Sequence, residues 1–150
     1  SYTYHYEQVI HTLLLPAAGN EEVGVVGNVV LDSCHFRHTV RLVGNHTIAN
    51  LQALLYLASH NARGYLYGKG ETYTAIRDSA VTFPAQEKGI LSVFCLGADA
   101  EGVTIRGGQY EVEDAVLTAD FPLGVSNHFT GAPVTVSVRH GSLLIGLLNE

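Results

Sequence analysis

The chain has 150 residues, of which 47% are hydrophobic and 15% charged, and its formal net charge is -6. A chain of this length buries about 70% of the surface that its unfolded form exposes, which is enough for one good core. The negative charge, with no basic cluster denser than Arg37, His38 and Arg41, and the absence of any apolar run near the roughly 18 residues of a membrane span argue against nucleic acid and membrane as partners.

Three tyrosines alternate with other residues at the start of the sequence, at Tyr2, Tyr4 and Tyr6. This alternation favours a strand that completes a sheet edge, covers a subunit interface or stacks on a heterocycle. A second strand is predicted over residues 9–15. The segment 21–34 is rich in valine and glycine, which favours a long strand or a hairpin over a helix.

One helix is predicted over residues 46–60, directly after a predicted strand at 39–43. Apolar residues recur there at helical spacing, from Ile48 to Ala58, and the side chain of Asn45 can cap the first turn. The pattern indicates a helix with one buried face.

From residue 64 onward, short apolar segments alternate with glycine-rich turns, which is typical of an antiparallel sandwich. The predicted strands cover residues 65–67, 72–77, 80–83, 89–96, 103–106, 109–112, 116–119, 134–138 and 143–148. We therefore expect a mainly β (α+β) protein, an antiparallel β-sandwich or jelly-roll-like fold with one helix.

The two cysteines, Cys34 and Cys95, lie far apart in apolar segments. This arrangement favours buried thiols in a reducing compartment, and hence a cytoplasmic protein. Cys34, His35 and His38 have a spacing that suits a metal ion. A structural zinc site needs four ligands, usually as two pairs, and no second such pair occurs, so we expect no metal.

The second half of the sequence resembles the C-terminal thiamine-binding β-sandwich of the thiamine pyrophosphokinases. The blocks that carry the resemblance occur in the family's order: S-V-F-C-L-G at 92–97, G-V-T-I-R-G-G at 102–108, G-V-S-N-H-F at 124–129, V-T-V-S-V at 134–138 and G-S-L-L-I at 141–145. The resemblance implies such a sandwich over residues 65–150, preceded at 1–64 by a reduced α/β remnant that holds the helix.

The resemblance is weaker upstream, where the family carries the aspartates that hold Mg²⁺ for pyrophosphoryl transfer from ATP. Asn45 stands where one of these aspartates is expected, and no G-D-x-D-S turn occurs. Because such a transfer needs carboxylates around Mg²⁺, we expect a catalytically inactive binder with no catalytic residues and no cofactor. The alternative is an active thiamine pyrophosphokinase, which would require Mg²⁺ and ATP.

The first candidate binding site is the segment Ser126, Asn127, His128 and Phe129, because the family places this turn at the thiamine site. A hydroxyl and a side-chain amide can match the edge of an aminopyrimidine. The alternative is a polar turn in which Asn127 adopts the left-handed conformation. His128 stands where the family has a glutamate, so the charge at this position differs from the family's, and a change of ligand would fit that difference.

A second group of candidate ligand-binding residues consists of Arg37, Arg41, Asn45 and His46. Guanidinium groups match phosphate oxygens, although salt bridging on the surface is the alternative for both arginines. In the family the active site lies between two subunits. The resemblance therefore implies a homodimer or larger homo-oligomer with an inter-subunit cleft. As an inactive binder, the protein is expected to hold a thiamine-like or nucleotide ligand in that cleft, for example to sequester a signalling nucleotide as a phage-type sponge does.

Overall fold

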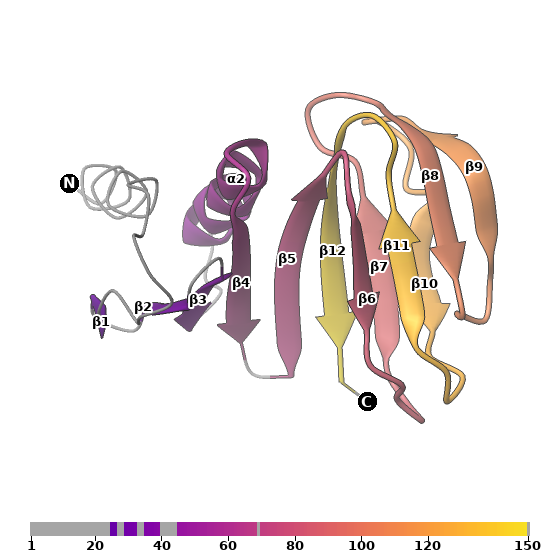
Figure 1. The fold of residues 1–150 in the computed structure, drawn as a ribbon, viewed down its shortest axis with the longest axis horizontal. Coiled ribbons are helices and arrows are strands. Elements are labelled where there is room, and N and C mark those ends of the chain that lie inside the picture. The colour runs from indigo at the N-terminus through magenta and orange to yellow at the C-terminus, as the bar shows by residue number, and fades with distance from the viewer. Residues whose placement is uncertain (1–24, 27–28, 33–34, 40–44, 69, 150) are drawn as a thin grey trace.

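The computed structural model describes residues 25–26, 29–32, 35–39, 45–68 and 70–149 of the chain (Figure 1). Within these ranges it contains one helix and twelve strands. In chain order they are β1 (Val25–Val26), β2 (Val29–Asp32), β3 (His35–Thr39), α2 (Asn45–Ser59), β4 (Arg63–Gly68), β5 (Glu71–Arg77), β6 (Ala80–Phe83), β7 (Ile90–Phe94), β8 (Ala100–Arg106), β9 (Val112–Leu117), β10 (Gly124–His128), β11 (Val134–Ser137) and β12 (Ser142–Leu148).

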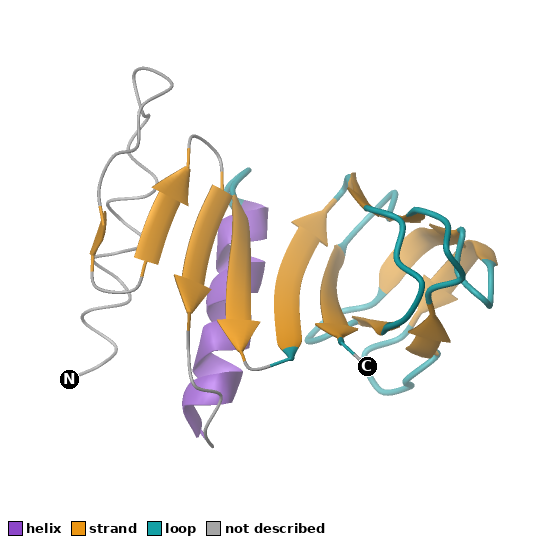
Figure 2. Ribbon diagram, turned by 90° about the horizontal axis from the view of Figure 1, so that it is seen from below, coloured by secondary structure: helices purple, strands orange, loops and turns teal. Residues whose placement is uncertain are grey.

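The strands form a large sheet with the order β1-β2-β3-β4-β5-β12-β7-β10 and a small sheet with the order β6-β11-β8-β9. Every pair is antiparallel except β3 and β4, which are parallel and are joined through α2. Figure 2 shows α2 running along one face of the large sheet. We call this the outer face, and the face that packs against the small sheet the inner face.

Side-chain alternation along β5 and β12 divides the buried residues between two cores. Ile76 and Ile145 point to the inner face and belong to the core between the two sheets. Their neighbours Ala75 and Leu144 point to the outer face and pack with Leu54 of α2. Both faces of these central strands are therefore covered, which explains their nearly continuous runs of buried residues.

The prediction of a mainly β sandwich is confirmed, and the described residues contain one helix. The helix runs from Asn45 to Ser59, within one residue of the predicted bounds. The valine-rich segment forms the hairpin of β1 and β2, as expected. The predicted strand at 9–15, the tyrosine segment and residues 40–43 lie outside the described residues.

Two predictions about individual strands are wrong. The predicted strand at 109–112 is largely a loop, because the Glu111 carboxylate accepts the N–H of Gly107 at 3.2 Å and closes a turn there. Conversely, residues 124–128 were not predicted as a strand but form β10. Within the described residues, no helix combines the length and the apolar character needed to cross a membrane.

Candidate ligand-binding site

The segment with the predicted ligand residues forms the edge strand β10 and contains a β-bulge. Gly124 pairs with Val93 and Asn127 pairs with Leu91, so an advance of three residues along β10 matches an advance of two residues along β7. Ser126 adopts the left-handed conformation, with φ of 62°. The alternative interpretation, in which Asn127 would be left-handed, is therefore wrong, because the bulge places that conformation one residue earlier.

The bulge presents Ser126 to solvent beside Ser92 of β7. The backbone N–H of Ser126 donates to Oγ of Ser92 at 3.0 Å. Ser92 lies between Leu91 and Val93, which both belong to the inner core, so its side chain is on the outer face. The hydroxyl of Ser92 thus replaces the ladder bond that the extra residue of β10 interrupts.

On the outer face, residues that are paired across neighbouring strands form a row over four strands, β5, β12, β7 and β10. Gly146 of β12 pairs with Tyr73 of β5 on one side and with Ser92 on the other, and the bulge of β10 follows. We call Tyr73, Gly146, Ser92 and Ser126 the outer row. It brings together an aromatic ring, a residue without a side chain and two hydroxyls.

Gly146 allows the ring of Tyr73 to approach the sheet closely. A Cβ placed on Gly146 would lie 2.7 Å from Cε1 of Tyr73, so any larger residue would push the ring away. Burial of the phenol and, to a smaller extent, the charge of Glu71 raise the pKa of Tyr73 above its ordinary value. Tyr73 therefore stays a neutral hydrogen-bond donor at physiological pH.

Asn127 points the opposite way, into the space between the two sheets, and is only 5% exposed. Its Oδ1 accepts the N–H of Tyr110 at 2.9 Å, and its Nδ2 donates to the carbonyl of Tyr110 at 2.6 Å. The backbone N–H of Gln109 also donates to the carbonyl of His128. Asn127 thus ties the loop between β8 and β9 to β10.

The two remaining residues of the motif also face different ways. Phe129 is buried in the core between the sheets. His128 pairs with Ile90, which lies two residues before Ser92 on β7, so His128 is on the outer face and is half-buried. Of the four predicted residues, Ser126 and His128 are on the outer face, and Asn127 and Phe129 are on the inner face.

The second group of predicted residues lies at the other end of the large sheet. Arg37 belongs to β3 and pairs with Tyr65 of β4. Asn45 and His46 are the first two residues of α2, and Arg41 lies outside the described residues. Four strands separate β3 from β10 in the large sheet, so one chain does not bring the two groups together.

The remaining candidates are metal-binding side chains and thiols. Among the described residues, no group of three or more His, Cys, Asp or Glu side chains is placed to hold a metal ion. Cys34 lies outside the described residues, whereas Cys95 is a free, buried thiol that donates to the carbonyl of Ala98. Burial is the main cause that raises the pKa of the Cys95 thiol.

Sequence reasoning missed Tyr73, Ser92 and Gly146. Each lies within a segment that was correctly predicted as a strand, at 72–77, 89–96 and 143–148. Alternation within each strand separates these residues from the inner core positions. Only the register between distant strands places them in one row.

Comparisons with known proteins agree with this architecture. The family model for the thiamin pyrophosphokinase vitamin B1 binding domain matches residues 80–143, which confirms the resemblance recognised in the sequence. No curated protein matches the chain significantly.

Several solved structures share the fold. The thiamine pyrophosphokinase of Bacillus subtilis has a TM-score of 0.68 and 18% identity, covering 76% of this chain and 56% of that one. The enzyme of Geobacillus thermodenitrificans has a TM-score of 0.68 and 17% identity, covering 76% and 54%. That of Candida albicans has a TM-score of 0.65 and 8% identity, covering 76% and 44%. The chain spans only about half the length of the first two and less of the third.

Proposed function

We propose that this chain binds a small heteroaromatic ligand on the outer row and does not transfer a pyrophosphoryl group. The observation that carries the proposal is the outer row itself, where the ring of Tyr73 and the hydroxyls of Ser92 and Ser126 lie at one level of a sheet. The match of residues 80–143 to a vitamin B1-binding domain supports a thiamine-like ligand.

The chemistry of the row fits such a ligand. The ring of Tyr73 offers a face on which a planar heterocycle can stack. Ser92 accepts the N–H of Ser126, so its own O–H remains able to donate to a ring nitrogen. The net charge of -6 attracts a cationic ligand such as thiamine more than an anionic nucleotide.

Asn127 and Phe129 have an indirect part in this proposal. Asn127 fixes the loop at Tyr110 against β10, and Phe129 anchors the same segment in the core. Together they hold the bulge that presents Ser126. His128 also lies on the outer face, at the position where the family resemblance implies a glutamate.

The proposal includes a second copy of the chain. Large apolar side chains are exposed on β10 and on the loop before it, at Phe121, Leu123 and Val125. Several large apolar side chains exposed at and beside a sheet edge are typical of an interface. A cytoplasmic homodimer that encloses the ligand between subunits would cover it, and such a protein would sequester its ligand rather than transform it.

Calorimetric titration with thiamine tests the site. Replacing Tyr73 with Leu should weaken binding about fivefold, because a stacked aromatic pair contributes about 0.5–1.5 kcal/mol. Gly146→Ala should have a similar effect by displacing the ring. The control is Tyr110→Leu, which removes an exposed tyrosine side chain outside the row. Equal affinity in all four proteins would reject the outer row as the site.

Incubation with ATP, thiamine and Mg²⁺ tests the absence of catalysis. We expect no AMP. Steady AMP release that depends on this chain would instead establish the enzymatic alternative. Native mass spectrometry of protein purified from cells would identify the ligand that it retains.

A further inference from the structure

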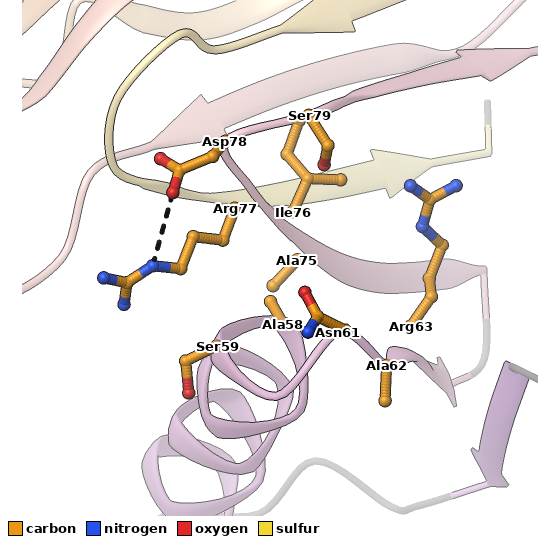
Figure 3. Close-up of a pocket in the computed structure, with 10 residues that line it drawn as sticks. All are labelled: Ala58, Ser59, Asn61, Ala62, Arg63, Ala75, Ile76, Arg77, Asp78 and Ser79. Carbon is orange, nitrogen blue, oxygen red and sulfur yellow. Dashed lines mark ion pairs between the residues drawn. The ribbon is translucent and has the colours of Figure 1, made fainter.

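On one side, the outer row is bordered by residues that α2 covers. The next row of paired positions on that side consists of Ala75, Leu144 and Phe94. These three residues pack in one cluster with Leu54 and Ala58 of α2. Figure 3, a view of the cleft at the end of α2, shows the side chains of Ala58 and Ala75 facing each other. A ligand that is wider than the outer row therefore cannot extend in this direction.

On its other side, the outer row is bordered by a second row, which is partly exposed. Its members pair one after another across β5, β12, β7 and β10: Glu71 with Leu148, Leu148 with Ile90, and Ile90 with His128. Directly paired residues of antiparallel strands point to the same face, so all four are on the outer face. We call these four residues the side row. It lies two residues, or about 7 Å, from the outer row along the strands.

The end of the side row on β5 carries a negative charge. Burial and, to a smaller extent, the charge of Glu71 raise the pKa of Tyr73, so the carboxylate acts on the phenol of the outer row. The Glu71 carboxylate forms no ion pair or hydrogen bond with another described residue. Its charge therefore remains available to a positively charged ring that stacks on Tyr73, and the aromatic ring attracts such a group as well.

The opposite end of the two rows offers hydrogen-bond donors and no carboxylate. The outer-face residues there, on β7 and β10, are Ile90, Ser92, Ser126 and His128. An imidazole donates through at least one ring N–H, and a hydroxyl donates its proton. The imidazole of His128 is half-buried and makes no hydrogen bond or ion pair with another described residue. This end therefore suits an anionic oxygen better than a cation.

The middle of the side row is apolar and sets the distance between the two ends. Leu148 is exposed, and Ile90 beside it is half-buried. Glu71 and His128 are three strand spacings apart, which is about 14 Å between their backbone positions. A ligand that contacts both ends must carry its positive and its negative group on opposite sides of an apolar or aromatic body.

We propose that the ligand of the outer row is a cationic heteroaromatic compound that carries a phosphate on a short tail. The positive ring stacks on Tyr73 beside Glu71, and the phosphate accepts hydrogen bonds from His128 and Ser126. This inference rests on the proposed function and deepens it, because it assigns a charge to each end of the ligand. Inorganic phosphate or an uncharged heterocycle would match only one end of the side row.

Calorimetric titration of the full chain with thiamine and with thiamine monophosphate tests the proposal, because the two compounds differ only in the phosphate. Wild type should bind the monophosphate about tenfold more tightly, since hydrogen bonds to charged groups are among the strong ones. His128→Ala should abolish this preference and leave the affinity for thiamine unchanged. His128→Lys, which supplies a charged donor at the same position, should keep the preference.

Glu71→Gln should behave differently from His128→Ala. It should weaken both compounds by a similar factor of about three, because both contain the positive ring and the lost charge is partly exposed to solvent. The matched controls are Glu101→Gln and His140→Ala. They remove exposed side chains of the same two kinds from a bridge at the small sheet. Both controls should bind the two compounds like wild type.

The outcomes separate this inference from the proposed function. Equal affinity of wild type for the two compounds, or a preference that survives His128→Ala, overturns the phosphate-tailed ligand. The outer row still stands in that case if Tyr73→Leu weakens thiamine binding. If neither compound binds, or if Tyr73→Leu changes neither affinity, the outer row fails and this inference fails with it.

Discussion

The inner and outer faces of the large sheet differ in how completely they are covered. On the inner face, Leu91, Val93 and Ile145 are at most 1% exposed beneath the small sheet. On the outer face, α2 covers Ala75 and Leu144 but stops short of the β7–β10 side. The inner face holds the fold together, whereas the outer row, which we propose as the ligand site, lies where the cover of the outer face ends.

The largest expected effect comes from shortening a buried side chain on the inner face. Ile145→Ala should lower the free energy of unfolding by about 2–5 kcal/mol, because it leaves a cavity in a fully packed core. Leu148→Ala, on the outer face of the same strand and 37% exposed, should cost much less. Urea denaturation of both variants measures the difference, and equal losses would contradict the contrast between the faces.

An intermediate effect is expected at the bulge, where neighbouring residues serve opposite faces. Asn127→Ala should destabilise the protein by about 1–3 kcal/mol, because the N–H and carbonyl of Tyr110 lose their partners. Ser126→Ala should leave the melting temperature nearly unchanged and weaken ligand binding instead. If Asn127→Ala keeps full stability but loses affinity, the amide contacts the ligand directly, as the sequence alone led us to expect.

The smallest effect concerns pH. The pKa of Tyr73 is raised above 10.0 in the folded state, mainly by burial. A group whose pKa is raised on folding contributes its stability fully below the unfolded pKa and loses it as the pH rises through the folded pKa. Wild type should therefore lose more stability above pH 10.0 than Tyr73→Phe does. Thermal unfolding of both proteins across that range checks the sign, and parallel curves would argue against a buried phenol.

Local sequence patterns predicted much of the fold. The alternation at 134–138 identified β11, and the apolar spacing from Ile48 to Ala58 identified α2. β10 was missed because its bulge breaks the two-residue period, and because glycine and polar residues there are typical of turns. The loop residues 109–111 were mistaken for a strand because the Glu111 contact that closes the loop involves a side chain.

The candidate site was predictable only in part. The sequence identified the segment 124–129 but not which of its side chains face outward, since that depends on one extra residue in the pairing with β7. Tyr73 and Gly146 meet because Glu71 pairs with Leu148 at the far ends of β5 and β12. No local sequence pattern predicts which residues of β5 and β12 pair with each other.

β12 occupies the middle of the large sheet, between β5 and β7, although it is the last described strand along the chain. During synthesis β5 and β7 therefore emerge well before the strand that joins them. Until β12 arrives, each presents an unpaired edge, and the outer row exists only as separate pieces. The ligand binding proposed for that row would thus appear only after Leu148 has been added, and it would report that the sheet has closed.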